Sequence, residues 1–272
     1  MKSDFRLWET ETSAYLTIPR FDDTDLVQHG FSTRLGGYSQ PPFQSLNLGL
    51  HVGDDKESVV KNRRLFCESL KINWQDLVAA EQVHGDAVYI VSAEDKGKGA
   101  ANYVTALSAT DALITNQPYL PLSTYYADCV PIFYLDPETP AIGLAHAGWK
   151  GTLAKIGAKT LLKMAEAFGS RPDKCLIGIG PSIGSCCYEV DEFIINKFKE
   201  YFWPVEQIFY PTSSKWKLNL QEANKLALLE AGALNENIFM SNICTRCQND
   251  LFFSYRAEGG KTGRMAAVIM LK

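Results

Sequence analysis

Two apolar runs in the middle of the chain decide its fold class: Val130 to Leu135, with the sequence VPIFYL, and Ala141 to His146, with the sequence AIGLAH. Short apolar runs bordered by Asp, Pro or Gly are typical of β-strands. The clearest helical pattern follows soon after, from Thr152 to Phe168, and Gly169 is placed to end it. The centre of the chain therefore predicts strands and helices packed together.

The same signals extend in both directions. Further strand-like runs are Val27 to Thr33, Leu77 to Val83, Ala87 to Val91, Ala112 to Thr115, Cys175 to Ile179 and Met265 to Leu271. Further helical patterns are Asp55 to Leu70 (capped by Asp54 or Asp55), Asp191 to Tyr201 and Asn219 to Ala231. Strands outnumber helices and do not alternate strictly with them. This predicts an α/β (α+β) layered sandwich of mixed β-sheets flanked by helices.

Composition narrows the class of protein. The 272 residues are 46% hydrophobic and 21% charged, with a formal net charge of -4, which is ordinary for a globular protein and argues against nucleic acid as a partner. No run approaches the ~20 apolar residues of a membrane span, and the first residues lack the apolar core of a secretory signal. Residues 34–42 and 92–109 look like surface loops and not like linkers. We expect one cytoplasmic domain over residues 1–272 and no contact with a membrane.

The chain has only four histidines, and two of them lie in segments that resemble an active site: His84 in EQVHG and His146 in AHAGWKG. Cys129 lies between them, in ADCVP. Two imidazoles and a thiolate suit zinc, and three protein ligands leave a fourth position open for water or substrate. Each of the three follows or precedes a predicted strand, so they can converge at one edge of the fold. Taken singly, each is more often an ordinary hydrogen-bonded or packed residue than a ligand.

Other polar residues near these segments are candidates for substrate contacts. Asp128, next to Cys129, could move a proton or hold the ligand in place. Arg34 and Asn47 lie in polar loops beside predicted strands and would either bind substrate or bond their own loops. Lys150 lies in GWKGT before the Thr152 helix, where a helix N-terminus could bind an anion or simply be capped by Thr152.

The seven cysteines need not pair in a reducing compartment. Cys67 and Cys175 lie in apolar surroundings and are predicted to be packed. Cys244-Thr245-Arg246-Cys247 is an isolated C-x-x-C motif. A structural zinc site needs a second ligand pair, and the adjacent Cys186-Cys187 pair is interpreted as packing, so no metal is expected there.

Taken together, several segments resemble one bacterial family, the YfiH/YlmD-type proteins, long labelled laccase-domain or polyphenol-oxidase proteins and now regarded as purine nucleoside phosphorylases. The resemblance runs nearly end to end and rests on residues 29–34 (HGFSTR), 45–49 (SLNLG), 82–85 (QVHG), 110–113 (TDAL), 127–131 (ADCVP), 146–151 (HAGWKG), 180–183 (GPSI) and 252–256 (FFSYR). One departure is visible: Ala257 follows Arg256 where many members have a second basic residue.

The resemblance implies a catalytic zinc on His84, Cys129 and His146. It implies phosphorolysis of adenosine, inosine, guanosine and S-methyl-5'-thioadenosine, and deamination of adenosine to inosine. The implied partners are purine nucleosides and phosphate. Guanidinium groups match phosphate geometry, so Arg34 and Arg256, together with Lys150, are the candidate phosphate contacts.

Three rival functions use the same residues. A His₂Cys set also describes a blue-copper site, so one copper ion is chemically feasible, but four histidines are too few for a multicopper oxidase. Cys129 and His146 could instead form the nucleophile and base of an amidase or other hydrolase, with cell-wall precursor editing as a role. A zinc-stabilised binding module would need a fourth protein ligand and would leave no open position.

Overall fold

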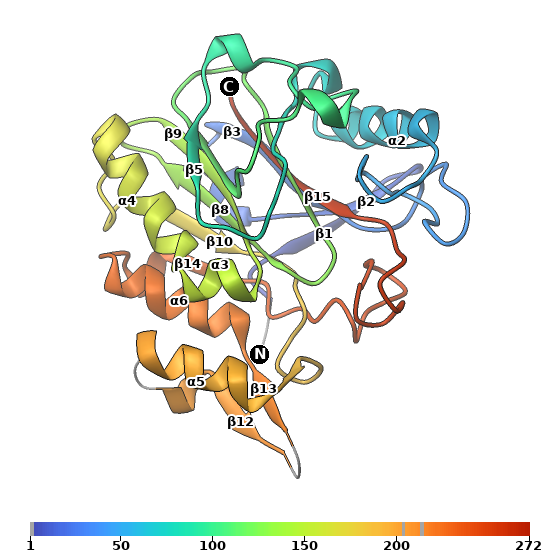
Figure 1. The fold of residues 1–272 in the computed structure, drawn as a ribbon. Helices are drawn as coiled ribbons and strands as arrows, with labels where there is room; N and C mark the ends of the chain where they lie inside the picture. Colours follow the sequence, from blue (N-terminus) through green and yellow to red (C-terminus); the bar gives the residue numbers. More distant parts are fainter. Residues whose placement is uncertain (1–2, 203–204, 213–214) are drawn as a thin grey trace.

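Two six-stranded sheets packed face to face form the centre of the fold, in a computed structural model that describes residues 3–202, 205–212 and 215–272 (Figure 1). The first sheet has the order β1 (Arg6–Glu9), β2 (Ala14–Thr17), β3 (Val27–Ser32), β15 (Met265–Leu271), β7 (Leu122–Tyr126) and β4 (Val78–Ala79). The second has the order β14 (Ile238–Met240), β10 (Leu176–Ile179), β8 (Val130–Asp136), β9 (Ala141–Ala147), β6 (Ala112–Thr115) and β5 (Val88–Ile90). Both sheets mix parallel and antiparallel pairs.

Strands β8 and β9 are buried along their whole length because both faces of the second sheet are covered. In β8, Phe133 and Leu135 face the first sheet, whereas Ile132 and Tyr134 face the helices. The uninterrupted apolar sequence of the run thus reflects burial on both sides. The predicted layered sandwich is confirmed.

Helices cover the two outer faces (Figure 1). The second sheet packs against α4 (Ile156–Phe168) and α6 (Leu220–Glu230), with α5 (Glu192–Tyr201) beside them. The first sheet packs against α2 (Lys56–Ser69), and α1 (Pro19–Asp22) is a single turn. A small sheet of β11 (Glu189–Val190), β13 (Trp216–Leu218) and β12 (Phe209–Pro211) lies next to α5. None of the helices in the described ranges combines the length and the apolar character that crossing a bilayer requires.

The predicted helix from Thr152 to Phe168 is wrong at its start. It is divided into α3 (Trp149–Leu153) and α4, because Lys155 adopts a left-handed φ of 56° between them. Gly148, and not Thr152, is the N-cap residue of α3. The cap of α2 is Asp55, whose carboxylate accepts the Ser58 N–H at 2.8 Å.

Candidate active site

Cys129 and His146 meet because their strands are antiparallel neighbours. Cys129 directly precedes β8, and His146 lies near the end of β9, opposite Pro131. The start of one strand and the end of its antiparallel partner share one edge of a sheet. The ring of His146 points between the two sheets, with its centroid 5.4 Å from that of Tyr126 in β7.

His84 joins them from the loop that follows β4. Its φ of 61° is left-handed, which is uncommon for a residue with a side chain. The carboxylate of Asp111 holds this turn, since it accepts the backbone N–H groups of Val83, His84 and Gly85 at 3.1, 3.0 and 2.7 Å. The strained residue is therefore fixed by three hydrogen bonds to one acceptor.

Asp111 also orients His146, whose Nδ1 lies 2.8 Å from Asp111 Oδ1. This leaves Nε2 of His146 to face the site, in the arrangement by which carboxylates orient metal-binding histidines. Burial alone raises the pKa of Asp111. The hydrogen bond and charge of His146, together with the loop N–H groups, outweigh burial and lower the pKa below its usual value. Asp111 was not predicted as a site residue. Its signal in the sequence was an acidic residue directly before the buried strand Ala112–Thr115.

The three predicted ligands form one group. The nitrogen or sulfur atoms that His84, Cys129 and His146 offer lie within 4.8 Å of one another. In the described part of the chain, no further His, Cys, Asp or Glu belongs to this group. His146 is buried and His84 is exposed, so the group is open on one side. A three-ligand His₂Cys set with an open position fits zinc.

Gly148 makes the approach of His84 to Cys129 sterically feasible. A Cβ at this position would lie 2.8 Å from Cδ2 of His84 and 3.1 Å from Sγ of Cys129. Only glycine leaves both side chains where they are.

Electrostatics favour the charged forms of the central pair. Burial alone raises the pKa of the Cys129 thiol, but the charge of His146 and hydrogen bonds with His146 and His84 outweigh it and lower the pKa to about 6. Burial alone lowers the pKa of His146, but Cys129 and Asp111 outweigh it and raise the pKa to about 9. Cys129 thus has the thiolate character that a metal ligand or a nucleophile requires.

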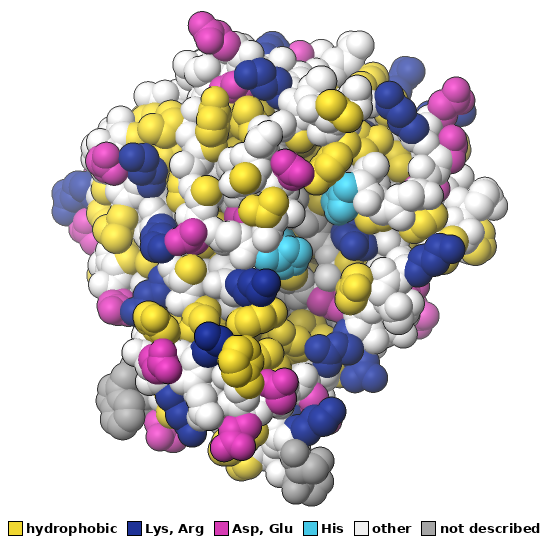
Figure 2. Space-filling view, viewed as in Figure 1, with side chains coloured by type: hydrophobic (Ala, Val, Ile, Leu, Met, Phe, Trp, Pro, Cys, Tyr) yellow, Lys and Arg dark blue, Asp and Glu magenta, His cyan; other side chains and the backbone are white. Residues whose placement is uncertain are grey.

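A cavity of about 510 Å³ opens over these three residues. Its other lining residues are His51, Gln82, Tyr125, Ala127, Asp128, Trp149, Ile183, Tyr188, Tyr255, Arg256 and Arg264. Figure 2 shows histidine side chains beside a hollow on this face, with basic side chains close by. The volume and the mixture of aromatic and polar groups are typical of a small-molecule site.

Of the predicted substrate contacts, Arg256 lines the cavity, where its guanidinium lies 5.2 Å from the ring centre of Tyr188. Lys150 does not line it: its side chain is exposed, with Nζ 5.7 Å from the ring centre of Trp149. Helix α3, which contains Lys150, has only five residues, so its N-terminus by itself does not support the predicted anion site.

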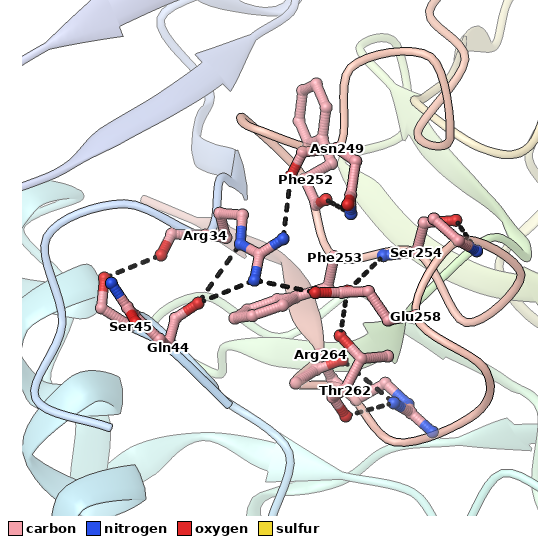
Figure 3. Close-up of polar contacts among 12 residues, drawn as sticks. Arg34, Gln44, Ser45, Asn249, Phe252, Phe253, Ser254, Glu258, Thr262 and Arg264 are labelled. Atoms are coloured by element: carbon pink, nitrogen blue, oxygen red, sulfur yellow. Dashed lines mark hydrogen bonds and ion pairs between the residues drawn. The ribbon is translucent and has the colours of Figure 1, made fainter. Parts of the chain in front are cut away.

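Arg34 and Asn47 do not line the cavity either. The Arg34 guanidinium donates to the carbonyl groups of Gln44 and Asn249 and pairs with Glu258 at 3.0 Å, above the ring of Phe253 (Figure 3). The fully buried Asn47 accepts the backbone N–H of Arg264 at 2.8 Å through Oδ1. Both side chains thus bond the segment 249–264, and neither lines the cavity, so direct contact of Arg34 or Asn47 with substrate stays a prediction.

That segment contributes Arg264, which was not predicted. Its Nη1 donates to the carbonyl groups of Thr262 and Gly263 at 2.8 and 3.0 Å (Figure 3). Its side chain lines the cavity. Arg264 thus provides a second arginine at the cavity that Arg256 lines, although Ala257 lacks the expected basic side chain. No local pattern marks Arg264, because it reaches the cavity only through the turn that precedes β15.

Asp128 lines the cavity beside Cys129, but both of its carboxylate oxygens are engaged. Oδ1 accepts the Thr245 hydroxyl at 2.6 Å and Oδ2 accepts the Arg256 N–H at 2.7 Å. Its φ of 85° turns the chain into β8. These contacts suit a residue that positions Cys129 and Arg256.

The remaining histidines differ in placement. His51 lines the cavity, and burial, aided by Arg264 and Arg63, lowers its pKa to about 4, so its imidazole is neutral at pH 7. His29 is buried in β3, where its Nε2 accepts the Ile18 N–H at 2.8 Å. His29 therefore belongs to the core and not to this site.

Comparisons with known proteins identify the family of this chain. Residues 28–272 match the family model described as multi-copper polyphenol oxidoreductase laccase. The chain is 41% identical over 244 residues to purine nucleoside phosphorylase YlmD of Bacillus subtilis (strain 168), covering 89% of this chain and 88% of that protein. It is 31% identical over 237 residues to adenosine deaminase RL5 from an unknown prokaryotic organism, covering 86% and 90%.

Solved structures show the same fold. Bacillus licheniformis hypothetical protein YfiH superimposes with a TM-score of 0.93 at 42% identity, covering 98% of this chain and 99% of that chain. YlmD from Geobacillus stearothermophilus also gives a TM-score of 0.93, at 38% identity and 99% coverage of both. The chain therefore belongs to the YfiH/YlmD family of laccase-domain proteins.

Proposed function

We propose that this protein is a zinc-dependent purine nucleoside phosphorylase. It acts with phosphate on adenosine, inosine, guanosine and S-methyl-5'-thioadenosine to give the free base and ribose-1-phosphate or its methylthio analogue, and it also deaminates adenosine to inosine. The names of its relatives support the two activities: purine nucleoside phosphorylase for YlmD and adenosine deaminase for RL5.

The observation that carries the proposal is the open His₂Cys group at the base of the cavity. A zinc ion held by His84, Cys129 and His146 would supply Lewis-acid chemistry, polarising a ligand atom and lowering the pKa of water toward ~7. The described residues do not fit the multicopper label of the family model, because His51 is the only other histidine near the group and His29 lies in the core.

The walls of the cavity suit the other parts of the substrates. Trp149, Tyr188 and Tyr255 offer aromatic faces against which a purine ring can stack. Arg256 and Arg264 offer two guanidinium groups, and guanidinium binds phosphate in a bidentate manner. We assign these two arginines to phosphate and the aromatic side chains to the base.

The test is to incubate zinc-loaded protein with adenosine, with and without phosphate, and to separate the products. With phosphate we expect adenine and ribose-1-phosphate. Without phosphate we expect inosine alone, because deamination needs only water. Cys129→Ala should lose both activities, whereas the matched control Cys175→Ala, which changes a buried thiol of the core, should retain them. Undiminished turnover in Cys129→Ala, or neither product from the wild-type protein, contradicts the proposal.

One further observation favours a second candidate, a cysteine hydrolase or amidase, with cell-wall precursor editing as its role. Asp111 contacts Nδ1 of His146 at 2.8 Å, and Sγ of Cys129 lies within 4.8 Å of a ring nitrogen of His146, so the three could act as orienting group, base and nucleophile. Metal dependence separates the two functions. A hydrolase would retain its activity after chelation and lose it to a thiol alkylator, and it would contain no stoichiometric zinc at His84.

A further inference from the structure

Four cysteines gather at a second place in the molecule, and none of them lines the cavity. Their sulfur atoms all lie within 4.8 Å of one another, and they are Cys186, Cys187, Cys244 and Cys247, here called the four-cysteine cluster. The prediction that Cys244-x-x-Cys247 has no second ligand pair is wrong, because the Cys186-Cys187 pair faces it. The two pairs are about sixty residues apart in the sequence, so the tertiary structure alone brings them together.

Strand pairing explains the meeting. Strands β10 and β14 are parallel neighbours, with Ile177 opposite Ile238. Parallel neighbours leave a sheet at the same end, and the chains beyond them stay paired, since the Thr245 N–H donates to the Ser182 carbonyl at 3.0 Å. The turn after Ser182 carries one cysteine pair, and the turn that begins at Cys244 carries the other.

The spacing of the thiols fits a shared metal ion. Sγ of Cys247 lies 3.4 Å from Sγ of Cys186 and 3.4 Å from Sγ of Cys187. A tetrahedral ion with metal–sulfur bonds of about 2.3 Å places its sulfur ligands roughly 3.8 Å apart. All four cysteines are free thiols.

The surroundings of the thiols are those of a built site. The Gly184 N–H donates to Sγ of Cys244 at 3.2 Å, as backbone amides do toward metal thiolates. A Cβ on Gly184 would lie 3.2 Å from Sγ of Cys186 and 3.1 Å from Cβ of Cys244, so glycine leaves these two side chains more room than any other residue would. The ammonium group of Lys217 donates to the Cys186 carbonyl at 2.9 Å and so places a positive charge at the backbone of the first cysteine pair.

We propose that the four-cysteine cluster binds a second, structural zinc ion. Four thiolates satisfy the coordination of zinc and leave no position for substrate. The site would fasten one cavity wall, because Ile183 and Tyr188 flank its first pair and Thr245, inside its second pair, bonds Asp128 at 2.6 Å. In this proposal the His84, Cys129 and His146 group serves catalysis, and the four-cysteine cluster stabilises the cavity wall that contains Ile183 and Tyr188.

The experiment uses the full chain with the first site removed. In His84→Ala/Cys129→Ala protein, purified with zinc and then freed of loosely bound metal, we expect one zinc per chain by elemental analysis. Its X-ray absorption should show sulfur neighbours only, at about 2.3 Å. This measurement requires no enzymatic activity, so it can succeed or fail independently of the proposed function.

A second pair of variants assigns the ligands. Adding Cys244→Ser/Cys247→Ser to the first-site variant should remove the remaining zinc, whereas adding Cys67→Ala/Cys175→Ala, two buried thiols outside the cluster, should not. If the serine variant does not fold, the X-ray absorption of its parent, the His84→Ala/Cys129→Ala protein, still tests the proposal, because it shows whether the zinc has sulfur neighbours only. Absence of metal from the parent, nitrogen or oxygen neighbours around its zinc, or iron with labile sulfide would overturn the proposal. So would a wild-type chain that, denatured without reductant and with chelator, titrates fewer than its seven thiols.

Discussion

Replacing Asp111 by asparagine tests the architecture of the active site most directly. Oδ1 accepts from the His84 N–H and lies beside His146 Nδ1, and Oδ2 accepts from the N–H groups of Val83 and Gly85. An amide keeps one oxygen, so either orientation loses two of these four contacts. Hydrogen bonds to a charged acceptor contribute about 1.5–3 kcal/mol each.

At about 1.5 kcal/mol each, two lost contacts lower the free energy of unfolding by about 3 kcal/mol. We use this lower value because Val83 and His84 are exposed, so water can replace part of the lost hydrogen bonding. Part of this cost should appear as weaker metal binding, since loss of an orienting carboxylate typically lowers metal affinity 10–100-fold. We expect Asp111→Asn to bind zinc about 10–100 times more weakly than the wild-type protein in competition with a chromogenic chelator at pH 7.

The matched control is Asp95→Asn, another buried aspartate, which accepts the Ser92 N–H and the Lys98 ammonium group and lies outside the cavity lining. It should lose stability but bind zinc normally. Circular dichroism and thermal unfolding verify that both variants are folded. Wild-type zinc affinity in folded Asp111→Asn, or an equal loss of affinity in the control, would refute the reasoning.

Three further outcomes are expected. Gly148→Ala should weaken zinc binding about 10-fold or more, because its Cβ would lie 2.8 Å from the His84 ring; unchanged affinity by chelator competition would contradict this. Arg264→Ala should raise the KM for phosphate more than that for nucleoside and leave phosphate-free deamination largely intact, and equal effects on both KM values would remove Arg264 from phosphate binding. Burial lowers the pKa of His29 to about 3, so the unfolded chain takes up a proton below pH ~6.5 that the folded chain refuses. The free energy of unfolding should therefore decrease as the pH is lowered from ~6.5 toward 3, by at most about 1.4 kcal/mol per pH unit from this residue. Denaturant titrations of His29→Gln should show a shallower decrease over the same pH range.

The strands of the core show how far local patterns reach. Strands β8 and β9 were predicted because burial on both faces demands apolar residues at every position, and β6 and β15 were predicted for the same reason. Strand β7 (Leu122–Tyr126, LSTYY) is equally buried but was not predicted. Its Ser123 and Thr124 hydroxyls bond the Val78 carbonyl and the Tyr126 hydroxyl. A sequence pattern does not show that these hydroxyl groups have partners inside the fold, so the polar residues of the strand look exposed.

The break between α3 and α4 has a similar origin. The helical pattern is continuous from Thr152 to Phe168, and nothing in it marks Lys155 as left-handed. The buried Thr152 hydroxyl accepts from the Asn224 side chain in α6 at 2.9 Å, and the Lys155 ammonium pairs with Glu230 of the same helix. Packing against α6 holds the chain there in a conformation that local propensity does not specify.

The sequence by itself determined the fold class and the trio of candidate ligands, because apolar runs report burial and because histidine is scarce enough for His84 and His146 to be noticed. The antiparallel register of β8 and β9 then placed Cys129 beside His146. Only the tertiary structure showed the contacts of Asp111 with the His84 turn and His146, the place of Arg264 at the cavity, and the four-cysteine cluster. A carboxylate, a guanidinium or a thiol has no periodicity of its own, and its function depends on partners that folding brings from elsewhere in the chain.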